Sequence, residues 1–198
     1  MGTENKLVKA LPFNCENQSS STWRQRADLC AELMKSLLPW SEQGFSLADI
    51  GCGDQKLRAS IDENGICCRY HGYDLFPQVP GVRQLDVENE SLPQCYDLAV
   101  MLGVIEYLED VEQTFQRLSR QASHLIVSHV IRQEEGLYTS QQLAKLNWRN
   151  HLSEAEMEAA LSNNGFVSVS RAMAPDRRTM LFACRSRVKL SGGRDLSS

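Results

Sequence analysis

Short apolar segments with the composition of β-strands alternate along this chain with helical segments. Strands that alternate with helices form a mostly parallel sheet with helices on both faces. The pattern therefore predicts an α/β fold with a doubly wound sheet of seven strands. The predicted strands are residues 45–51, 69–74, 82–87, 96–102, 124–130, 166–173 and 179–186.

The last two segments indicate how the sheet ends. Residues 166–173 and 179–186 are separated by only five residues, 174–178. A connection this short can join only antiparallel neighbours, because parallel strands need a long crossover. We therefore expect one antiparallel strand, contributed by a C-terminal β-hairpin.

Apolar periodicity and capping residues predict three helices. The first begins at Ser20 or Ser21 and ends near Pro39, and the others cover residues 109–121 and 153–164. The chain then divides into an N-terminal arm and amphipathic helix (1–44), an α/β domain (45–188) and a disordered tail (189–198). The 198 residues fit one such domain with a hydrophobic core.

Composition excludes several classes of protein. A net charge of −4 and a pI of about 5.6 argue against nucleic acid and anionic membrane as partners. The seven cysteines are odd in number and form no C-x-x-C, so we expect reduced thiols, with neither a disulfide framework nor a metal site. Because the chain has no apolar signal region and no membrane-length apolar run, we expect a cytoplasmic protein.

Glycines and acidic residues lie where the predicted strands end. Gly51 and Gly53 follow the first strand, and Asp74 ends the second, which resembles a dinucleotide site. That site would need a third glycine where Lys56 stands, and Asp54 would repel a pyrophosphate. The loop therefore suits a nucleoside that has no phosphate and carries positive charge, and a nicotinamide-dependent oxidoreductase is disfavoured.

Four motifs in order resemble one family over residues 47–185. These are LADIGCGDQ, HGYD, LDVENESLPQCYDLAVMLGVIEYLED and the closing strand pair. The sequence resembles a class I S-adenosylmethionine-dependent methyltransferase, most similar to small bacterial enzymes of the MetW-like and type-11 kinds. The resemblance implies a Rossmann-like fold, S-adenosylmethionine as cofactor and S-adenosylhomocysteine as product. Gln55 departs from the motif, which has its third glycine at this position.

The resemblance also implies contacts with the methionine end of the cofactor. Asp49 and the loop of Gly51, Cys52 and Gly53 would bind its amino and carboxylate groups. Leu102 and Gly103 would line the methionine arm, and the N-terminal helix could close over the cofactor as a lid.

Other strand ends would bind the nucleoside. Asp74 would accept hydrogen bonds from the ribose hydroxyls, while Leu75 or Phe76 packs on adenine. The Asp86 carboxylate would accept from the adenine amino group, and the Val87 N–H would donate to the ring. As an alternative, Asp54 and Asp86 could be turn or capping residues.

Methyl transfer needs alignment of donor and acceptor and, for many acceptors, a base. Our first candidates for a base or orienting group are His129 and His151, followed by Glu106 and Tyr107. Each also has a structural alternative. His129 could make hydrogen bonds at a strand end and His151 at a helix cap, while Glu106 and Tyr107 could cap the next helix and pack against it.

The polar segment 131–152 is the predicted region for acceptor recognition, with Tyr138, Trp148 and Arg149 available for stacking or anion contacts. We expect methyl transfer to oxygen or nitrogen of a small-molecule or glycan-type acceptor. The second hypothesis is a catalytically inactive protein that binds S-adenosylmethionine or S-adenosylhomocysteine and acts through a partner.

Overall fold

The computed structural model describes residues 20–38, 44–133 and 138–188. The predicted arm before residue 20 and the predicted tail after residue 188 lie outside this range. Of the N-terminal part, the structure describes the helix α1, Ser20–Leu37, which begins at the predicted serines.

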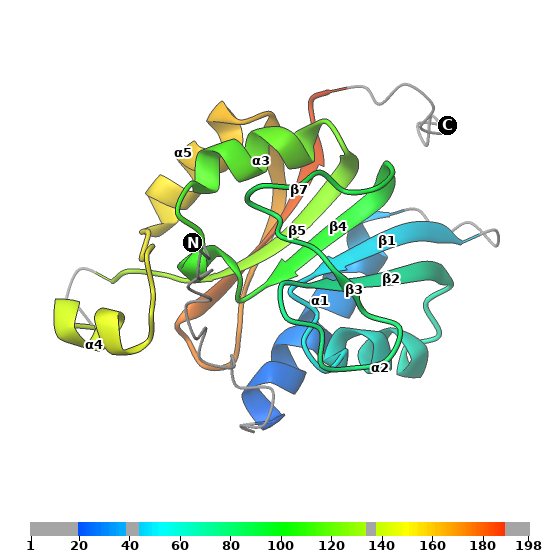
Figure 1. Ribbon diagram of the computed structural model, residues 1–198, viewed down its shortest axis with the longest axis horizontal. Coiled ribbons are helices and arrows are strands. Elements are labelled where there is room, and N and C mark those ends of the chain that lie inside the picture. The colour runs from blue at the N-terminus through cyan, green and yellow to red at the C-terminus, as the bar shows by residue number, and fades with distance from the viewer. Residues whose placement is uncertain (1–19, 39–43, 134–137, 189–198) are drawn as a thin grey trace, which may run out of the picture.

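One mixed sheet of seven strands forms the centre of the molecule, in the order β3-β2-β1-β4-β5-β7-β6 (Figure 1). Strands β1 to β5 pair in parallel, and β7 runs antiparallel to both β5 and β6. The predicted topology, with a single antiparallel strand from a C-terminal hairpin, is therefore confirmed. The strands are β1 Phe45–Ile50, β2 Cys68–Asp74, β3 Arg83–Gln84, β4 Tyr96–Leu102, β5 Ala122–Val130, β6 Phe166–Met173 and β7 Thr179–Ser186.

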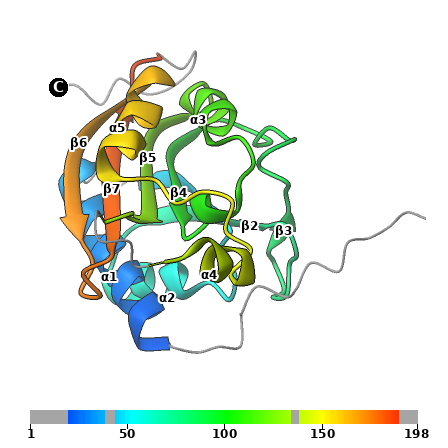
Figure 2. The ribbon, with the colours of Figure 1, turned by 90° about the vertical axis from the view of Figure 1, so that its left-hand side faces the viewer.

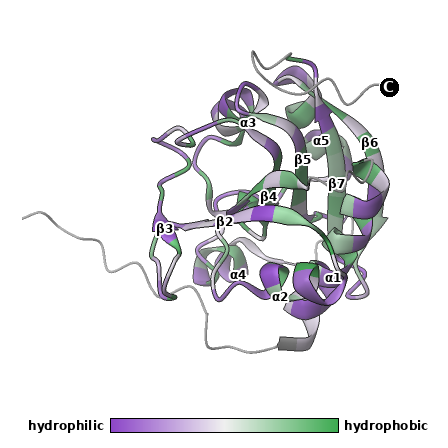
Figure 3. Ribbon diagram, turned by 90° about the vertical axis from the view of Figure 1, so that its right-hand side faces the viewer, coloured by the Kyte–Doolittle hydropathy of each residue, from purple (hydrophilic) through white to green (hydrophobic). Residues whose placement is uncertain are grey.

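Helices cover both faces of this sheet (Figure 2). Helices α1 and α2 (Lys56–Glu63) pack on one face, and α3 (Val111–Ser119) and α5 (Glu154–Asn163) pack on the other. Each face has its own buried cluster: Ile61 and Leu98 belong to the first, and Phe115 and Met101 to the second. Figure 3 shows apolar residues along β5 and β7, which both have a neighbouring strand on each side.

The connection between β5 and α5 contains a helix that the sequence analysis did not predict. Helix α4, Ser140–Lys145, starts with a capping box in which Thr139 and Gln142 exchange hydrogen bonds. None of its residues is buried, so no apolar periodicity marks it in the sequence. The short 3-10 helix η1, Ile105–Tyr107, follows β4. No helix in the described part of the chain has the length and apolarity needed to cross a membrane.

Candidate functional site

The carboxyl ends of β1, β2, β4 and β5 lie at one edge of the sheet. The strand order reverses between β1 and β4, since β2 and β3 follow β1 on one side and β5 follows β4 on the other. Ligands of doubly wound sheets bind beside such a reversal. The residues predicted to bind a cofactor come together here, because each lies at or just after the end of one of these strands or of β3.

The N–H groups of the loop after β1 form hydrogen bonds with the end of β2. The N–H groups of Gly51 and Cys52 donate to the Tyr73 carbonyl at 2.8 and 3.0 Å. The Gly53 N–H donates to Oδ2 of Asp74 at 3.0 Å. A phosphate cradle needs free N–H groups, and these three are already bonded within the protein.

Cys52 has its side chain inside the protein. It is buried, and its sulfur lies against Gly72 of β2, where an added Cβ would be only 3.0 Å away. The Cys52 thiol therefore faces the protein interior and not the surface of the loop.

Gln55, at the position of the motif's third glycine, has a left-handed backbone with φ 65° and ψ 36°. It is the N-cap residue of α2, and its N–H donates to the Cys52 carbonyl at 2.8 Å. This conformation costs a residue with a side chain about 1–2 kcal/mol, whereas glycine adopts it freely. The left-handed backbone conformation at this position thus explains why the motif has glycine there. In this chain, glutamine adopts the same conformation at a cost in folding free energy.

We expect Gln55→Gly to stabilise the free protein by up to about 1 kcal/mol, because it removes this strain. Among the described residues, the substitution removes an exposed 3.3 Å hydrogen bond that the Gln55 side chain accepts from Arg58. Chemical denaturation measures the effect. Ala59→Gly, at an exposed position inside α2, is the matched control and should destabilise by about 1 kcal/mol. Equal losses in the two variants would contradict the assignment of strain to Gln55.

Asp49 is a buried carboxyl near the end of β1, with 2% of its surface exposed. The Tyr70 hydroxyl donates to its Oδ2 at 2.5 Å. Burial raises the pKa of Asp49 to about 7, with a further contribution from the charge of Asp74, while the Tyr70 hydrogen bond acts in the opposite direction. A cation bound beside Asp49 would favour its ionised form.

Asp74 ends β2 and organises the backbone around it. Besides the Gly53 bond, its Oδ1 accepts from the Phe76 N–H at 2.9 Å. Each carboxylate oxygen can accept one further hydrogen bond. Leu75 and Phe76 are 41% and 38% exposed, so two neighbouring large apolar side chains are accessible at this strand end.

Asp86 has the contacts of a turn residue, which was the alternative considered for it. Its Oδ1 accepts from the Glu88 N–H at 3.1 Å, and its Oδ2 from the Asn89 side chain at 2.8 Å. Val87 is buried, and its carbonyl accepts from Arg117 at 2.6 Å. The adenine contacts of Asp86 and Val87 stay a prediction.

The end of β4 lies directly under the N-terminal part of α1. Gly103 has a φ of 66°, and its N–H donates to the Ser128 hydroxyl at 2.9 Å. A Cβ at Gly103 would lie 2.3 Å from the Trp23 ring, so the indole packs on this glycine. Sequence reasoning missed this contact, because the periodicity of α1 does not say which strand end the helix reaches.

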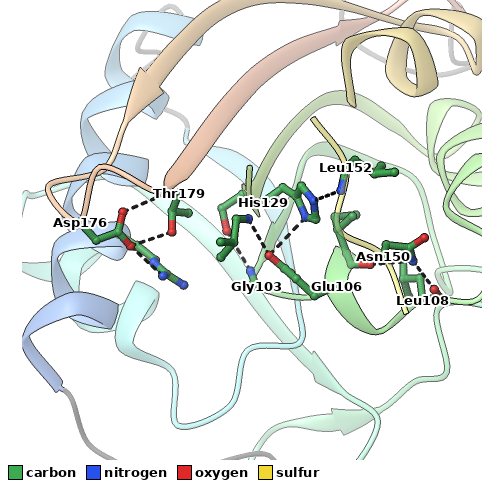
Figure 4. Close-up of polar contacts among 12 residues, drawn as sticks. Gly103, Glu106, Leu108, His129, Asn150, Leu152, Asp176 and Thr179 are labelled. Atoms are coloured by element: carbon green, nitrogen blue, oxygen red, sulfur yellow. Dashed lines mark hydrogen bonds and ion pairs between the residues drawn. The ribbon is translucent and has the colours of Figure 1, made fainter. Parts of the chain in front are cut away.

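His129 and Glu106 form a buried pair at the end of β5 (Figure 4). His129 is fully buried, and its Nδ1 is 3.2 Å from Oε1 of Glu106. The Leu152 N–H donates to Nε2 at 2.8 Å, so Nε2 is an acceptor and the proton lies on Nδ1. Burial would raise the pKa of Glu106, but His129 and the Val130 N–H lower it below its usual range. Both ring nitrogens of His129 therefore face groups of the protein.

Hydrogen bonds join the segment before α5 to η1, next to the pair of His129 and Glu106 (Figure 4). The N–H groups of Arg149 and Asn150 donate to the Glu106 carbonyl at 2.6 and 3.1 Å. The Asn150 side chain donates to the carbonyls of Ile105 and Leu108. The backbone of residues 149–152 thus has a defined position relative to the ends of β4 and β5.

That segment carries three aromatic rings in mutual contact. The ring centroids of Tyr138, Trp148 and His151 are 5.2 to 5.9 Å apart. Trp148 also forms a hydrogen bond with Tyr107 of η1. Burial lowers the pKa of His151, and its buried Nε2 has no hydrogen-bond partner in the described part of the protein. The four predicted catalytic candidates therefore form two pairs: Glu106 contacts His129, and Tyr107 and His151 both contact Trp148.

No three His, Cys, Asp or Glu side chains among the described residues are placed to hold a metal ion. The sequence matches a family described as a methyltransferase domain over residues 22–171. No curated protein matches the chain.

Several solved structures have the same fold. Magnesium protoporphyrin IX methyltransferase from Synechocystis PCC 6803, with bound SAH, is 17% identical with a TM-score of 0.65, and the match covers 84% of both chains. The N-methyltransferase NodS from Bradyrhizobium japonicum WM9, in complex with S-adenosylhomocysteine, is 14% identical with a TM-score of 0.60, covering 91% of this chain and 94% of its own. The mitomycin 7-O-methyltransferase MmcR is 17% identical with a TM-score of 0.62, covering 84% of this chain but only 54% of its own. At these identities, the similarity shows a shared fold.

Proposed function

The chain belongs to the methyltransferase domain family, and from this premise we propose that it transfers the methyl group of S-adenosylmethionine to oxygen or nitrogen of a small molecule. Glycan-type acceptors are included in the proposal. The structural neighbours, which include an N-methyltransferase and an O-methyltransferase, are compatible with either acceptor atom.

One observation carries the choice of cofactor: the glycine loop has carboxylates beside it and no free N–H among Gly51, Cys52 and Gly53. Asp49 and Asp74 lie beside this loop, and the charge of Asp74 adds to the burial that raises the pKa of Asp49. Such a loop repels phosphate and attracts a cationic ligand. S-adenosylmethionine has an ammonium and a sulfonium and no phosphate, so the residues fit it.

The proposed contacts follow the ends of the strands. Asp49 would hold the amino group of the methionine end, and Asp74 would accept from the ribose hydroxyls with its remaining lone pairs. The exposed side chains of Leu75 and Phe76 would pack on adenine.

The bound cofactor supplies an electrophilic methyl carbon, whose bond to sulfur breaks as the bond to the acceptor forms. The protein must align the acceptor, exclude water and remove a proton where the acceptor carries one. We propose His151 as the base, because burial lowers the pKa of its imidazole, which favours the neutral ring, and its Nε2 has no hydrogen-bond partner among the described residues. Glu106 and His129 would act as positioning residues, which hold the backbone of residues 149–152 through the contacts described above.

Calorimetry with S-adenosylmethionine, S-adenosylhomocysteine and NADH tests the proposal. We expect binding of both sulfur nucleosides and none of NADH. A folded protein that binds neither sulfur nucleoside would refute the proposal. Release of S-adenosylhomocysteine in the presence of candidate acceptors separates an enzyme from a protein that only binds the cofactor.

Replacing Asp74 by Ala is expected to weaken binding of S-adenosylhomocysteine by about 1–3 kcal/mol, the usual cost of leaving buried donors unpaired. Calorimetry measures the change, and thermal unfolding checks the fold. Asp62→Ala, which removes an exposed acid from α2, is the matched control and should leave affinity unchanged. Equal affinity of the Asp74 variant and the wild type would disprove the ribose contact.

A further inference from the structure

The N-terminal part of α1 lies against the loop that follows β4. The Trp23 indole packs on Gly103, and the next residue, Val104, packs on Gly51. An added Cβ would lie 2.3 Å from the Trp23 ring at Gly103 and 2.4 Å from Val104 at Gly51. Residues 103–104 are thus enclosed between α1 and the glycine loop, so Trp23 lies beside the proposed methionine end of the cofactor site.

A guanidinium group and a carboxylate fix the position of this indole. The Arg26 guanidinium carbon lies 4.7 Å from the centroid of the Trp23 ring, in cation–π geometry. Its Nη2 is 2.9 Å from Oδ2 of Asp176, in the turn between β6 and β7. The two charged side chains are only 12% and 18% exposed, so solvent screens this ion pair less than a surface pair.

Asp176 is itself held rigidly in that turn (Figure 4). Its Oδ1 accepts from the N–H groups of Arg178 and Thr179 at 2.9 and 2.8 Å, and its Oδ2 accepts from the Thr179 hydroxyl at 2.7 Å. Burial would raise the pKa of Asp176, but these hydrogen bonds and Arg26 lower it to about 2. The carboxylate stays charged at neutral pH, so the ion pair persists there.

In the described part of the chain, the other charged contacts of α1 lie within the helix or reach α2. Arg24 forms ion pairs with Asp28 of its own helix and Glu63 of α2, and Asp28 accepts from Ser60 at 2.6 Å. These contacts hold the helix to its neighbour without reaching the hairpin. Within the described residues, Arg26–Asp176 is the ion pair that joins α1 to the hairpin of β6 and β7.

We propose that Trp23 is a cofactor-contacting residue that forms the wall over the methionine end of the site, and that Arg26 and Asp176 are positioning residues that hold it there. This inference rests on the proposed function. Its consequence is that the ion pair between α1 and the hairpin determines how long the cofactor remains bound.

Dissociation of S-adenosylhomocysteine, followed by stopped-flow displacement, tests this role. We expect Trp23→Ala and Arg26→Met each to accelerate dissociation about tenfold, with Trp23→Phe in between. Because both changes remove the same wall, the double variant should dissociate no faster than the single ones. Arg24→Met is the matched control on the same helix and should stay within about twofold of the wild type.

Each other outcome has a distinct meaning. Tighter binding in Trp23→Ala would show that the indole obstructs the site and would overturn the inference. Unchanged dissociation in Arg26→Met, or independent multiplicative effects in the double variant, would overturn the positioning role. Wild-type protein that fails to bind S-adenosylhomocysteine would instead refute the proposed function. Circular dichroism verifies the fold, and Trp23→Phe serves if Trp23→Ala does not fold.

Discussion

Asn in place of Asp49 is expected to stabilise the free protein at pH 8 by on the order of 2–4 kcal/mol while weakening its binding of S-adenosylhomocysteine. The wild-type carboxyl has a pKa raised by burial to about 7, against 3.8 as its ordinary value. Above pH 7, the folded protein must therefore hold a buried negative charge, which the amide of Asn does not carry. Asn can still accept the hydrogen bond from Tyr70.

The sign of the pH dependence follows from the raised pKa. Between pH 4 and 7 the folded wild type binds more protons at Asp49 than the unfolded chain does, so this residue's contribution to stability falls as the pH rises. Below pH 4 the contribution is fully present, and above pH 7 it is lost. Urea denaturation of wild type and variant from pH 4 to 8 isolates this residue, because the contributions of the histidines cancel in the difference.

Binding should change in the opposite direction. If Asp49 holds the amino group of the cofactor, affinity for S-adenosylhomocysteine rises with pH through about 7 in the wild type and not in Asp49→Asn. Asp62→Asn, at an exposed position, is the control for both measurements and should change stability by less than about 0.5 kcal/mol. A variant that is less stable than the wild type at pH 8 would contradict the pKa assigned to Asp49.

Apolar periodicity and capping residues predicted most of the strands and helices, because most of these elements depend on residues close together in the sequence. The predicted strands match the seven observed ones closely, except that only Arg83–Gln84 pairs in β3. Ser153 and Glu156 form the capping box at the start of α5 that their spacing suggests. The helix α4 was missed because its signal is only a cap, with no apolar face.

The candidate site was less predictable, because its contacts join residues far apart in the chain. The pattern placed Asp74 at a strand end, but it could not show that Asp74 already binds the Gly53 N–H. The sequence pattern indicated His129 as a candidate base, but it could not show that Glu106 and the Leu152 N–H contact the two nitrogens of its ring. Burial and partners of this kind depend on tertiary packing, which periodicity does not encode.

The second large effect is expected from Gly51→Ala, which should destabilise the free protein by roughly 2–5 kcal/mol. Gly51 has a φ of 72°, which costs alanine about 1–2 kcal/mol. Its added Cβ would also lie 2.4 Å from Cγ2 of Val104, and overpacking of this kind costs about 1–3 kcal/mol. Gly53→Ala is the matched control in the same loop, because φ is 50° there and a Cβ would meet no atom of the described residues within 4 Å.

A rescue experiment separates the two parts of this cost. Removing Cγ2 with Val104→Ala leaves the Val104 Cβ, which lies 3.8 Å from the added Cβ at ordinary contact distance. In the Val104→Ala background, Gly51→Ala should therefore cost only about as much as Gly53→Ala, roughly 1–2 kcal/mol. Denaturation of the wild type, the two single variants and the double variant completes the cycle. An undiminished cost in that background would mean that backbone strain alone, and not the contact with the β4 loop, requires glycine at residue 51.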